Sequence, residues 1–554
     1  MNKGLTLQII HNRAYGRQVK SCMRTVFFLF IVASVSADDD LRSRYNLTPL
    51  PPIPYPVNNT YNPDRVELGR LLFFDPILGG EKDVACGTCH LPTFGMADGR
   101  RLAAGTSGHG FGPDRILGFS AVSGDTIIEE ARHTMTIFNT AFNKDESGEA
   151  SAKGFMLWDG KDRGLEAQAL RAIIVRVEMR GDGYPREMAV DSVLARLRMI
   201  PDYIELFNKA FPAEADSVAR QIPRLACEWD TTPLKSVITR STLGRAIAAF
   251  ERELVTDDTP YDHYVAGDDN ALTPSQKRGL EVFFEKGNCA SCHSGPEFSE
   301  GRFRVQGVEQ IGPGQPLAST NTGTPRPSGR DRGRFVTSGN REELFAFRTV
   351  SLRQVAKTPP YMHDGALSTL EEVIEFYDRG GGDEESIDPE RLDSNLFNLG
   401  LTEGEKKDLL HFLEALTDET IHVKLPPRVP SGLKPAGIEL VDSESGLVGD
   451  YSLLIQAGKS STSFATISIH PNPFNSTTVI NFEAPRGGAF DLIIFNVLGQ
   501  KVRHLLAKDI TAGRHSVQWD GHNEDRKPLA SGVYFVTLHG AAGFSAKQRL
   551  LLLR

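Results

Sequence analysis

The chain has 554 residues, of which 40% are hydrophobic and 24% charged, and its net charge is -9 at pH 7. This length predicts about three or four folding units that each bury a core, so a short disulfide-stapled scaffold is excluded. Mild acidity without a long basic stretch also argues against a nucleic-acid-binding protein, in which lysine and arginine would be clustered.

The N-terminus predicts a secretory signal peptide over residues 1–37. Basic residues precede an apolar run at 25–35, and small residues lead to a cleavage site after Ala37. The apolar run is shorter than the roughly 20 residues that cross a bilayer. We therefore expect the segment to be removed from an exported protein, whether translation begins at Met1 or at Met23.

Four of the six cysteines fall in two copies of C-x-x-C-H, CGTCH at 86–90 and CASCH at 289–293. Zinc or redox pairs are the alternative, but here a histidine directly follows each pair. The motif is typical of c-type haem, because two thiols bond to the haem vinyl groups while the adjacent imidazole reaches the iron. The expected haem-binding residues are Cys86, Cys89 and His90 for the first haem, and Cys289, Cys292 and His293 for the second.

The remaining cysteines do not predict a disulfide. Cys22 would leave with the signal peptide, and Cys227 then has no partner. We therefore expect an exported protein that keeps no spare disulfide pair.

Helical periodicity dominates residues 45–422. Apolar residues return every three or four positions at 192–210, 243–254, 370–377 and 403–416. A glycine followed by helix-spaced apolar residues also precedes each haem motif, in VELGRLLFF and RGLEVFFE. We expect a mainly α region of two c-type cytochrome lobes with long loops, at 45–265 and 266–422.

The pattern changes twice after the second lobe. Residues 423–460 are rich in Pro, Ser and Gly and predict a linker. Residues 461–554 contain alternating runs separated by Gly, Pro and Asn turns, namely VINFEA, DLIIFNV, HSVQWDG, GVYFVTL and KQRLLLL. This pattern predicts a small immunoglobulin-like β-sandwich.

Residues 45–422 resemble the bacterial dihaem cytochrome c peroxidase family, which includes the dihaem enzyme that matures methylamine dehydrogenase. The resemblance lies in the order of several motifs, which are LGRLLFFDP, CGTCH, FGMADGR, GTSGHGFG, WDGKDRGLEAQAL, VEM, CASCH, SLRQVAKTPPYMHDG and TLEEVIEFYDRGG. It implies a peroxidatic N-terminal lobe and an electron-transfer C-terminal lobe.

The last domain resembles the C-terminal sorting domain of type IX secretion. The motifs that carry the resemblance are HPNPFNSTTVINF, VLGQKV, WDG, ASGVYF and the terminal KQRLLLLR. The resemblance implies that the protein is exported to the periplasm and then to the cell surface or the medium by the type IX secretion machinery.

The peroxidase resemblance implies catalytic roles for Trp158, Gln168 and Glu178, which keep the family's ten-residue intervals. Glu178 would accept a proton from one oxygen of hydrogen peroxide and return it to the other, a task that suits a carboxylate in a dry pocket. Gln168 would hydrogen-bond the peroxide, and Trp158 would relay electrons between the haems. The alternative for each is a polar residue on a helix surface.

The resemblance also implies metal ligands outside the two haem motifs. His109 lies in a Gly-flanked loop and is similar to the loop histidine that caps the peroxidatic iron in resting peroxidases. Thr358 and Pro360 match positions whose carbonyls hold a calcium ion between the haems. His133 is another local candidate for iron, and it stands where the family usually has a calcium-binding asparagine, so calcium stays open.

Tyr377 and Met362 compete for the sixth position on the second iron. Tyr377 lies nineteen residues after Thr358, which is the family's interval to its axial ligand. A phenolate would stabilise oxidised states, whereas a Met362 thioether would raise the haem potential as in ordinary electron-accepting cytochromes. The alternative for Tyr377 is an aromatic residue packed on an amphipathic helix.

Three functions follow from these expectations. The first is a cytochrome-c peroxidase that reduces hydrogen peroxide with electrons from a small cytochrome c or cupredoxin. The second is a peroxide-driven dihaem oxidase of a protein or organic substrate, and the third is a non-catalytic dihaem electron carrier. A homodimer is left open, and no nucleic-acid partner is expected.

Overall fold

The structure is a computed structural model that describes residues 40–225, 236–310, 330–382, 389–437 and, with short gaps, 468–553. It has two compact units, residues 1–48 and 49–554, and the first contains helix α1 (Leu41–Arg44). The predicted signal peptide and Cys227 lie outside the described residues. Within the described ranges, no helix is both long and apolar enough to cross a membrane.

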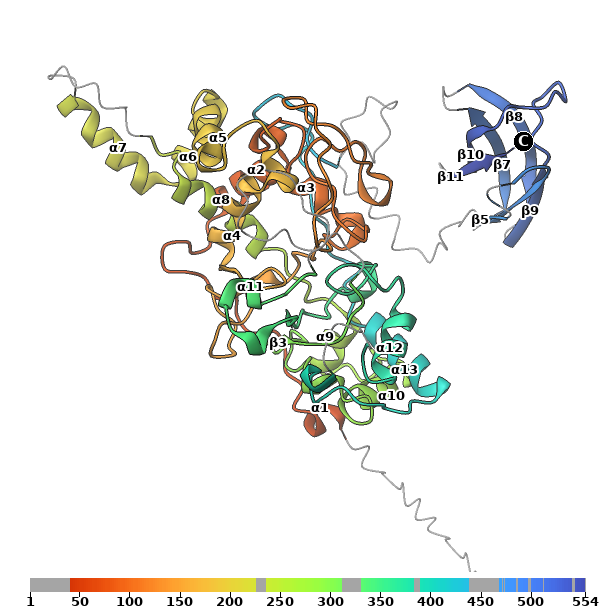
Figure 1. Cartoon of the computed structure of the whole chain (residues 1–554), viewed down its shortest axis with the longest axis horizontal. Coiled ribbons are helices and arrows are strands. Elements are labelled where there is room, and N and C mark those ends of the chain that lie inside the picture. The colour runs from red at the N-terminus through yellow and green to blue at the C-terminus, as the bar shows by residue number, and fades with distance from the viewer. Residues whose placement is uncertain are drawn as a thin grey trace, which may run out of the picture. The chain divides into compact units, whose positions relative to one another are not determined.

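The N-terminal lobe is built from helices and long loops (Figure 1). Its helices are α2 (Pro63–Phe74), α3 (Cys86–Cys89), α4 (Leu165–Ile174), α5 (Ala189–Leu197), α6 (Pro201–Ala210), α7 (Pro212–Leu225) and α8 (Arg240–Arg252). A short hairpin, β1 (Phe155–Met156) with β2 (Asp162–Arg163), encloses the WDG motif. The C-terminal lobe contains α9 (Pro260–Val265), α10 (Pro274–Phe284), α11 (Phe335–Ser338), α12 (Leu370–Asp378), α13 (Glu403–Glu414) and the hairpin of β3 (Phe303–Arg304) with β4 (Phe347–Arg348).

Helix α2 crosses α8 closely, because Gly69 has no side chain. A Cβ atom at Gly69 would overlap the carbonyl oxygen of Ala246 on α8. The start of α2 is fixed by Asn62, whose side chain accepts a hydrogen bond from the backbone N–H of Arg65, and by Pro63 in the first turn. Helix α2 is the last α-helix before the first haem motif in the chain.

The C-terminal lobe repeats this arrangement. Helix α10 crosses α13, and a Cβ atom at Gly279 would overlap the carbonyl oxygen of Asp408. Thr273 and Thr402 cap the two helices through their side chains. The repeated glycine motif of the sequence is therefore a structural repeat, in which one glycine per lobe allows two helices to meet before a haem motif.

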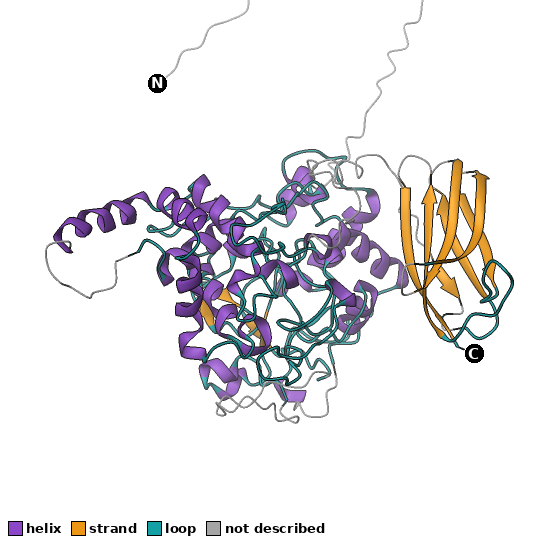
Figure 2. Ribbon diagram, turned by 90° about the horizontal axis from the view of Figure 1, so that it is seen from above, coloured by secondary structure: helices purple, strands orange, loops and turns teal. Residues whose placement is uncertain are grey.

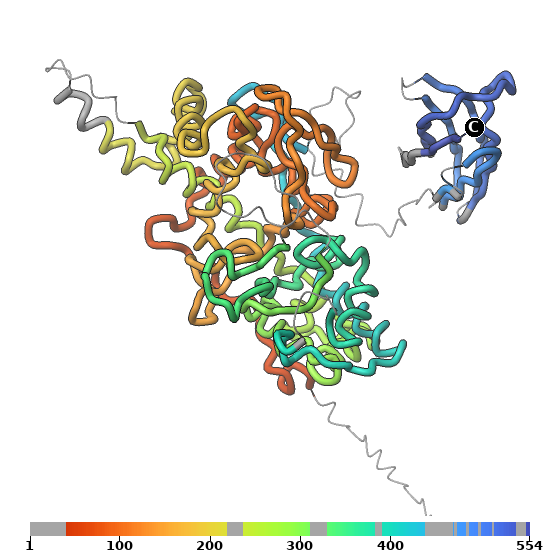
Figure 3. Tube along the Cα trace, viewed as in Figure 1, coloured from red at the N-terminus to blue at the C-terminus, as the bar shows by residue number. Residues whose placement is uncertain are grey.

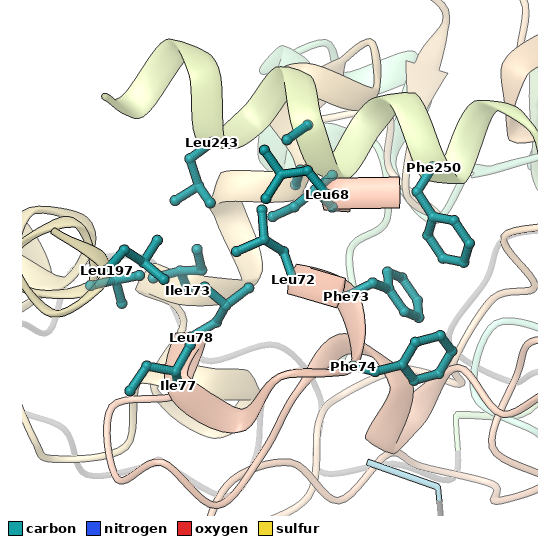
Figure 4. Close-up of a cluster of buried hydrophobic side chains, with 14 of the residues drawn as sticks. Leu68, Leu72, Phe73, Phe74, Ile77, Leu78, Ile173, Leu197, Leu243 and Phe250 are labelled. Carbon is teal, nitrogen blue, oxygen red and sulfur yellow. The ribbon is translucent and has the colours of Figure 1, made fainter. Parts of the chain in front are cut away.

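The N-terminal core lies where α2, α4, α5 and α8 meet (Figure 4). Leu68 and Leu72 of α2 and Leu243 of α8 are fully buried in it. Burial of a leucine side chain stabilises a fold by about 1.5–3 kcal/mol relative to its exposure. This cluster holds the segment that carries the first haem motif.

Two boundaries within the helical lobes differ from the sequence prediction. Residues 192–210 form two helices rather than one, because Pro201 starts α6 and the preceding Ile200 is extended. Helix α9 belongs with the C-terminal lobe, since Tyr261 packs its ring on Phe298 and Phe412. The predicted lobe boundary between residues 265 and 266 is therefore too late in the chain.

The predicted linker at 423–460 begins too early. Val423, Val429 and Ala436 are buried, and the backbone N–H of Ala436 donates to the carbonyl of Phe74 at 2.9 Å. Figure 3 shows residues 423–437 running among N-terminal segments. Their proline-rich composition indicated a linker, but their scattered apolar residues pack on the first lobe. Residues 438–460 lie outside the described part of the chain.

The C-terminal domain is a sandwich of two antiparallel sheets (Figure 2). One sheet has the order β11-β10-β7-β8 and the other β5-β6-β9. The strands are β5 (Ser468–His470), β6 (Thr478–Ala484), β7 (Gly488–Asn496), β8 (Lys501–Ile510), β9 (Gly513–Trp519), β10 (Gly532–Gly540) and β11 (Phe544–Leu552). Trp519 is buried between the sheets. The sequence prediction missed β5 and β8, because β5 is short and β8 lacks strict alternation.

Candidate functional site

The first C-x-x-C-H motif forms the short helix α3 and faces a cavity. Cys86, Cys89 and His90 line this cavity, and both cysteines are free thiols. Burial raises the pKa of Cys89 to about 12, so the thiol is not a ready thiolate. His90 Nδ1 lies 2.9 Å from the carbonyl oxygen of Met96, which leaves Nε2 available to a metal. These residues fit a covalently attached haem.

The second motif repeats this geometry in the other lobe. Cys289, Cys292 and His293 line a second cavity, and both cysteines are free. His293 Nδ1 lies 2.9 Å from the carbonyl oxygen of Phe298. A main-chain carbonyl thus fixes the ring orientation of each predicted proximal histidine, as is usual for imidazole ligands. The residues present fit one haem in each lobe.

Acidic and polar side chains converge in the first cavity. Its walls include Glu130, Trp158, Lys161, Gln168, Glu178 and Glu251. The structure therefore brings the three predicted catalytic residues, Trp158, Gln168 and Glu178, to the same cavity as the CGTCH motif. Their catalytic roles stay predictions.

Glu178 is held at this cavity by a single π-helical turn, η5 (Arg176–Arg180). The backbone N–H of Thr106 donates to the carbonyl of Glu178 at 2.8 Å and fixes the turn. Burial raises the pKa of the Glu178 carboxyl, while Lys161 and Arg171 oppose the rise. A raised pKa makes this carboxyl a stronger base, which suits a group that accepts a proton and returns it.

Sequence reasoning missed two further buried carboxyls in this cavity. Burial raises the pKa of Glu130 to about 8, with a further contribution from Glu178. Burial also raises the pKa of Glu251 to about 8. Each has one buried oxygen without a hydrogen-bond partner among the described residues. The acidic pair at 129–130 stands close to Arg132 in the sequence, but only the fold shows that Glu130 reaches the cavity.

Trp158 lies between the two haem cavities, since its side chain lines both of them and a third, smaller cavity. Its indole Nε1–H donates to the carbonyl oxygen of His133 at 3.0 Å. The backbone N–H of His133 in turn donates to the carbonyl of His363 at 2.8 Å. The tryptophan is thus fixed by hydrogen bonds that lead from one lobe into the other.

Both candidates for the second iron line the second cavity. Tyr377 projects from α12, and its hydroxyl oxygen accepts a hydrogen bond from Gln306 Nε2 at 2.7 Å. Burial raises the pKa of the Tyr377 phenol. Met362 lies in a turn with a positive φ of 72°. The structure brings both side chains to the cavity and leaves the choice between them open.

His109 is not brought to the first cavity. It is exposed, and its backbone pairs with Ile116 through two hydrogen bonds of 2.9 Å. Ligation of iron by His109 would require its loop to rearrange. His133 does line the cavity, but its Nδ1 lies 2.7 Å from the carbonyl of Arg100, and burial lowers the pKa of its ring to about 4.

Thr358 and Pro360 line the third cavity together with His133 and Arg348. The described wall of this cavity contains no carboxylate, and Arg348 contributes a positive charge. Calcium prefers six to eight oxygen ligands that usually include carboxylates. No group of three or more His, Cys, Asp or Glu side chains suited to a metal occurs within the described ranges. These residues fit calcium poorly.

Comparisons with known proteins agree with this architecture. The sequence model described as "Di-haem cytochrome c peroxidase" matches residues 63–270, and that described as "FlgD Ig-like domain" matches residues 472–543. The chain is 34% identical over 407 residues to cytochrome-c peroxidase IdrP1 of Denitromonas iodatirespirans, a match that covers 70% of this chain and 91% of that protein.

Two further similarities involve MauG proteins. The chain is 32% identical over 374 residues to methylamine utilization protein MauG of Methylorubrum extorquens, covering 68% of this chain and 84% of that one. A crystal structure of a MauG-like protein associated with microbial copper homeostasis has a TM-score of 0.49 and 27% identity, covering 67% and 94%. With two haem motifs that each face a cavity, this chain belongs to the di-haem cytochrome c peroxidase family, whose members carry two c-type haems.

Proposed function

We propose that the protein reduces hydrogen peroxide to water, with electrons that pass from an external donor through the C-terminal haem to the N-terminal haem. One peroxide consumes two protons and two electrons and gives two waters. The observation that carries the proposal is the Glu178 carboxyl, whose pKa is raised by desolvation, in the same cavity as the CGTCH motif. The relatives named cytochrome-c peroxidase support the same reaction.

The residues of the first cavity have separate roles in the proposed reaction. A haem held by Cys86, Cys89 and His90 would supply the iron and the redox chemistry for peroxide reduction. Glu178 would accept a proton from one oxygen of the peroxide and return it to the other. Gln168 would hydrogen-bond the peroxide, and Trp158 would carry electrons between the lobes. His109 would reach this cavity only if its loop moved inward.

We propose that Tyr377 would bind the iron of the second haem, with Met362 as the alternative. Gln306 donates a hydrogen bond to the Tyr377 oxygen, and such a bond stabilises the ionised phenolate that binds iron. The same observation favours a second candidate function, in which peroxide drives oxidation of a protein or organic substrate. A phenolate ligand stabilises oxidised iron and so suits storage of oxidising equivalents.

A combined stopped-flow and steady-state experiment tests the reaction. We expect the half-reduced protein to consume hydrogen peroxide and to oxidise two equivalents of a reduced small cytochrome c or cupredoxin per peroxide. Peroxide consumption without oxidation of either donor would favour the organic oxidase. If both irons stay six-coordinate in every redox state and peroxide does not react, the protein is an electron carrier.

We further propose that the protein is exported to the periplasm and then to the cell surface or the medium. The signal sequence at 1–37 supports the first step, and the motifs of the C-terminal sandwich support recognition by the type IX secretion machinery. Deletion of residues 461–554 should leave haem content and peroxide turnover intact but keep the protein in the periplasm. Surface delivery of the truncated protein would contradict the sorting role.

The homodimer and the calcium ion rest on the family resemblance alone. A homodimer would appear as a doubled mass in light scattering of the purified holoprotein. The calcium ion that the resemblance implies would have to lie beside the charged Arg348 in the third cavity, so these residues do not support it.

A further inference from the structure

Arg348 lies at the junction of the two lobes. It belongs to β4 of the C-terminal lobe, and its backbone N–H donates to the carbonyl of Trp158 at 2.8 Å. The residue is only 6% exposed, and its side chain lines both haem cavities as well as the third cavity. A single cation therefore borders both haem sites.

The guanidinium has only neutral partners among the described residues. Nε donates to the carbonyl of Leu157 at 3.0 Å, Nη1 donates to Asn143 Oδ1 at 3.1 Å, and Nη2 lies 4.0 Å from the sulfur of Met135. Burial lowers the pKa of Arg348 to about 10. A guanidinium has five N–H groups, so two remain for further acceptors.

Other buried arginines have carboxylate partners, which Arg348 lacks among the described residues. Arg132 pairs with Asp159 and Asp331, and Arg353 pairs with Asp262. A buried charge is strongly disfavoured without a counter-ion. Because the described residues give Arg348 no carboxylate partner, its counter-ion would have to be an anion bound inside the cavities.

Each haem brings two propionate carboxylates into its cavity. We propose that Arg348 is a shared counter-cation, which pairs with a propionate of each haem through its two remaining N–H groups. Bonds of guanidinium to carboxylate are among the stronger hydrogen bonds in proteins. The inference needs the two haems of the family but not the proposed peroxidase reaction, so it can fail or succeed independently of that reaction.

This placement lets one residue influence the reduction potentials of both haems. A positive charge near an iron favours its reduced form, because reduction lowers the charge on the haem. One residue that pairs with both haems raises both potentials together. It also keeps the paired propionates ionised as the pH falls.

The test compares Arg348→Gln and Arg348→Lys with Arg334→Gln in the full-length holoprotein. Arg334 is a matched control, since it also joins the lobes through the carbonyls of Asp159 and Gly160 but lines neither haem cavity. Spectroelectrochemical titration of each variant gives both haem potentials as a function of pH. Haem content and thermal stability are measured in parallel.

We expect Arg348→Gln to lower both potentials and to make both more pH-dependent, since unpaired propionates protonate at higher pH. Arg348→Lys keeps a cation and should keep both potentials, and their dependence on pH, close to the wild-type values. Arg334→Gln should leave both potentials unchanged. A shift of only one potential would overturn the sharing. Unchanged potentials with lowered thermal stability would show that Arg348 only packs.

If Arg348→Gln fails to incorporate haem, Arg348→Lys and the wild-type protein test the proposal instead. Pairing holds one propionate of each haem ionised from neutral pH down to about pH 5, because a cation lowers a carboxyl pKa by about 1–3 units. Infrared spectra of wild-type protein with isotope-labelled haem propionates should therefore keep one carboxylate band per haem over that range. Loss of both carboxylate bands of a haem would overturn the proposal for that haem.

Discussion

The two haem cavities share an attachment motif but differ in their acids. In the first cavity, Glu130, Glu178 and Glu251 have raised pKa values and no ion pair among the described residues. In the second, the carboxylate of Asp393 is paired with Arg304, and leucine side chains form much of the wall. Unpaired acids of raised pKa can exchange protons, whereas paired charges stay fixed. The difference supports our proposal that proton transfer takes place in the first lobe and electron transfer in the second.

The largest expected effect comes from Glu178→Gln, which keeps the side-chain shape but removes the proton acceptor. The rate of peroxide reduction should fall by about 10²–10⁴, as for other positioned general bases. Both resting haem spectra should stay nearly unchanged. Glu251→Gln is the matched control in the same cavity and should retain most activity. A Glu178→Gln enzyme of normal rate would remove the basis for placing proton transfer there.

Tyr377→Phe should change the second haem alone. Loss of an anionic oxygen ligand would alter the spectrum of that haem and raise its potential. Potentiometric titration followed by absorbance separates the two haems. If Tyr377→Phe leaves the second haem untouched while Met362→Leu changes it, the axial ligand is Met362 and the organic oxidase loses its main support.

Glu130→Gln should change how stability depends on pH. The carboxyl of Glu130 has an ordinary pKa of 4.5 and a folded pKa of about 8. Its stabilising contribution is therefore present below about pH 4.5 and is lost as the pH rises through 8, by up to about 1.4 kcal/mol per pH unit. Thermal denaturation of the variant should show a smaller loss between these limits. An identical pH profile would mean that Glu130 is not desolvated when haem is bound.

The smallest expected effect is that of EDTA. Because the third cavity combines Arg348 with a described wall that lacks carboxylates, chelation should leave both haem spectra and peroxide turnover unchanged. Metal analysis of the untreated protein should find less than one calcium per chain. Loss of activity on chelation, restored by calcium, would show that the carbonyls of Thr358 and Pro360 suffice.

The sequence predicted the features that depend on local spacing. Both C-x-x-C-H motifs, the helices α8, α12 and α13, and the glycine before each haem motif are encoded within a few neighbouring residues. The pairing state of a charge depends instead on the fold. Glu130 and Arg348 are ordinary charged residues in the sequence. Only the fold leaves one oxygen of Glu130 without a hydrogen-bond partner among the described residues and surrounds Arg348 with neutral groups such as Met135 and Leu157. The course of 423–437 across the first lobe is non-local for the same reason.

The hydrogen bond of Trp158 constrains the chemistry of the indole if charge passes through it. An oxidised indole is a strong acid, but its N–H faces the amide carbonyl of His133, which is a very weak base. The proton then has no acceptor along this bond, so the indole can lose and regain an electron while its hydrogen stays in place. Charge transfer between the lobes would consequently be insensitive to solvent deuteration, even where peroxide reduction itself is slowed in heavy water.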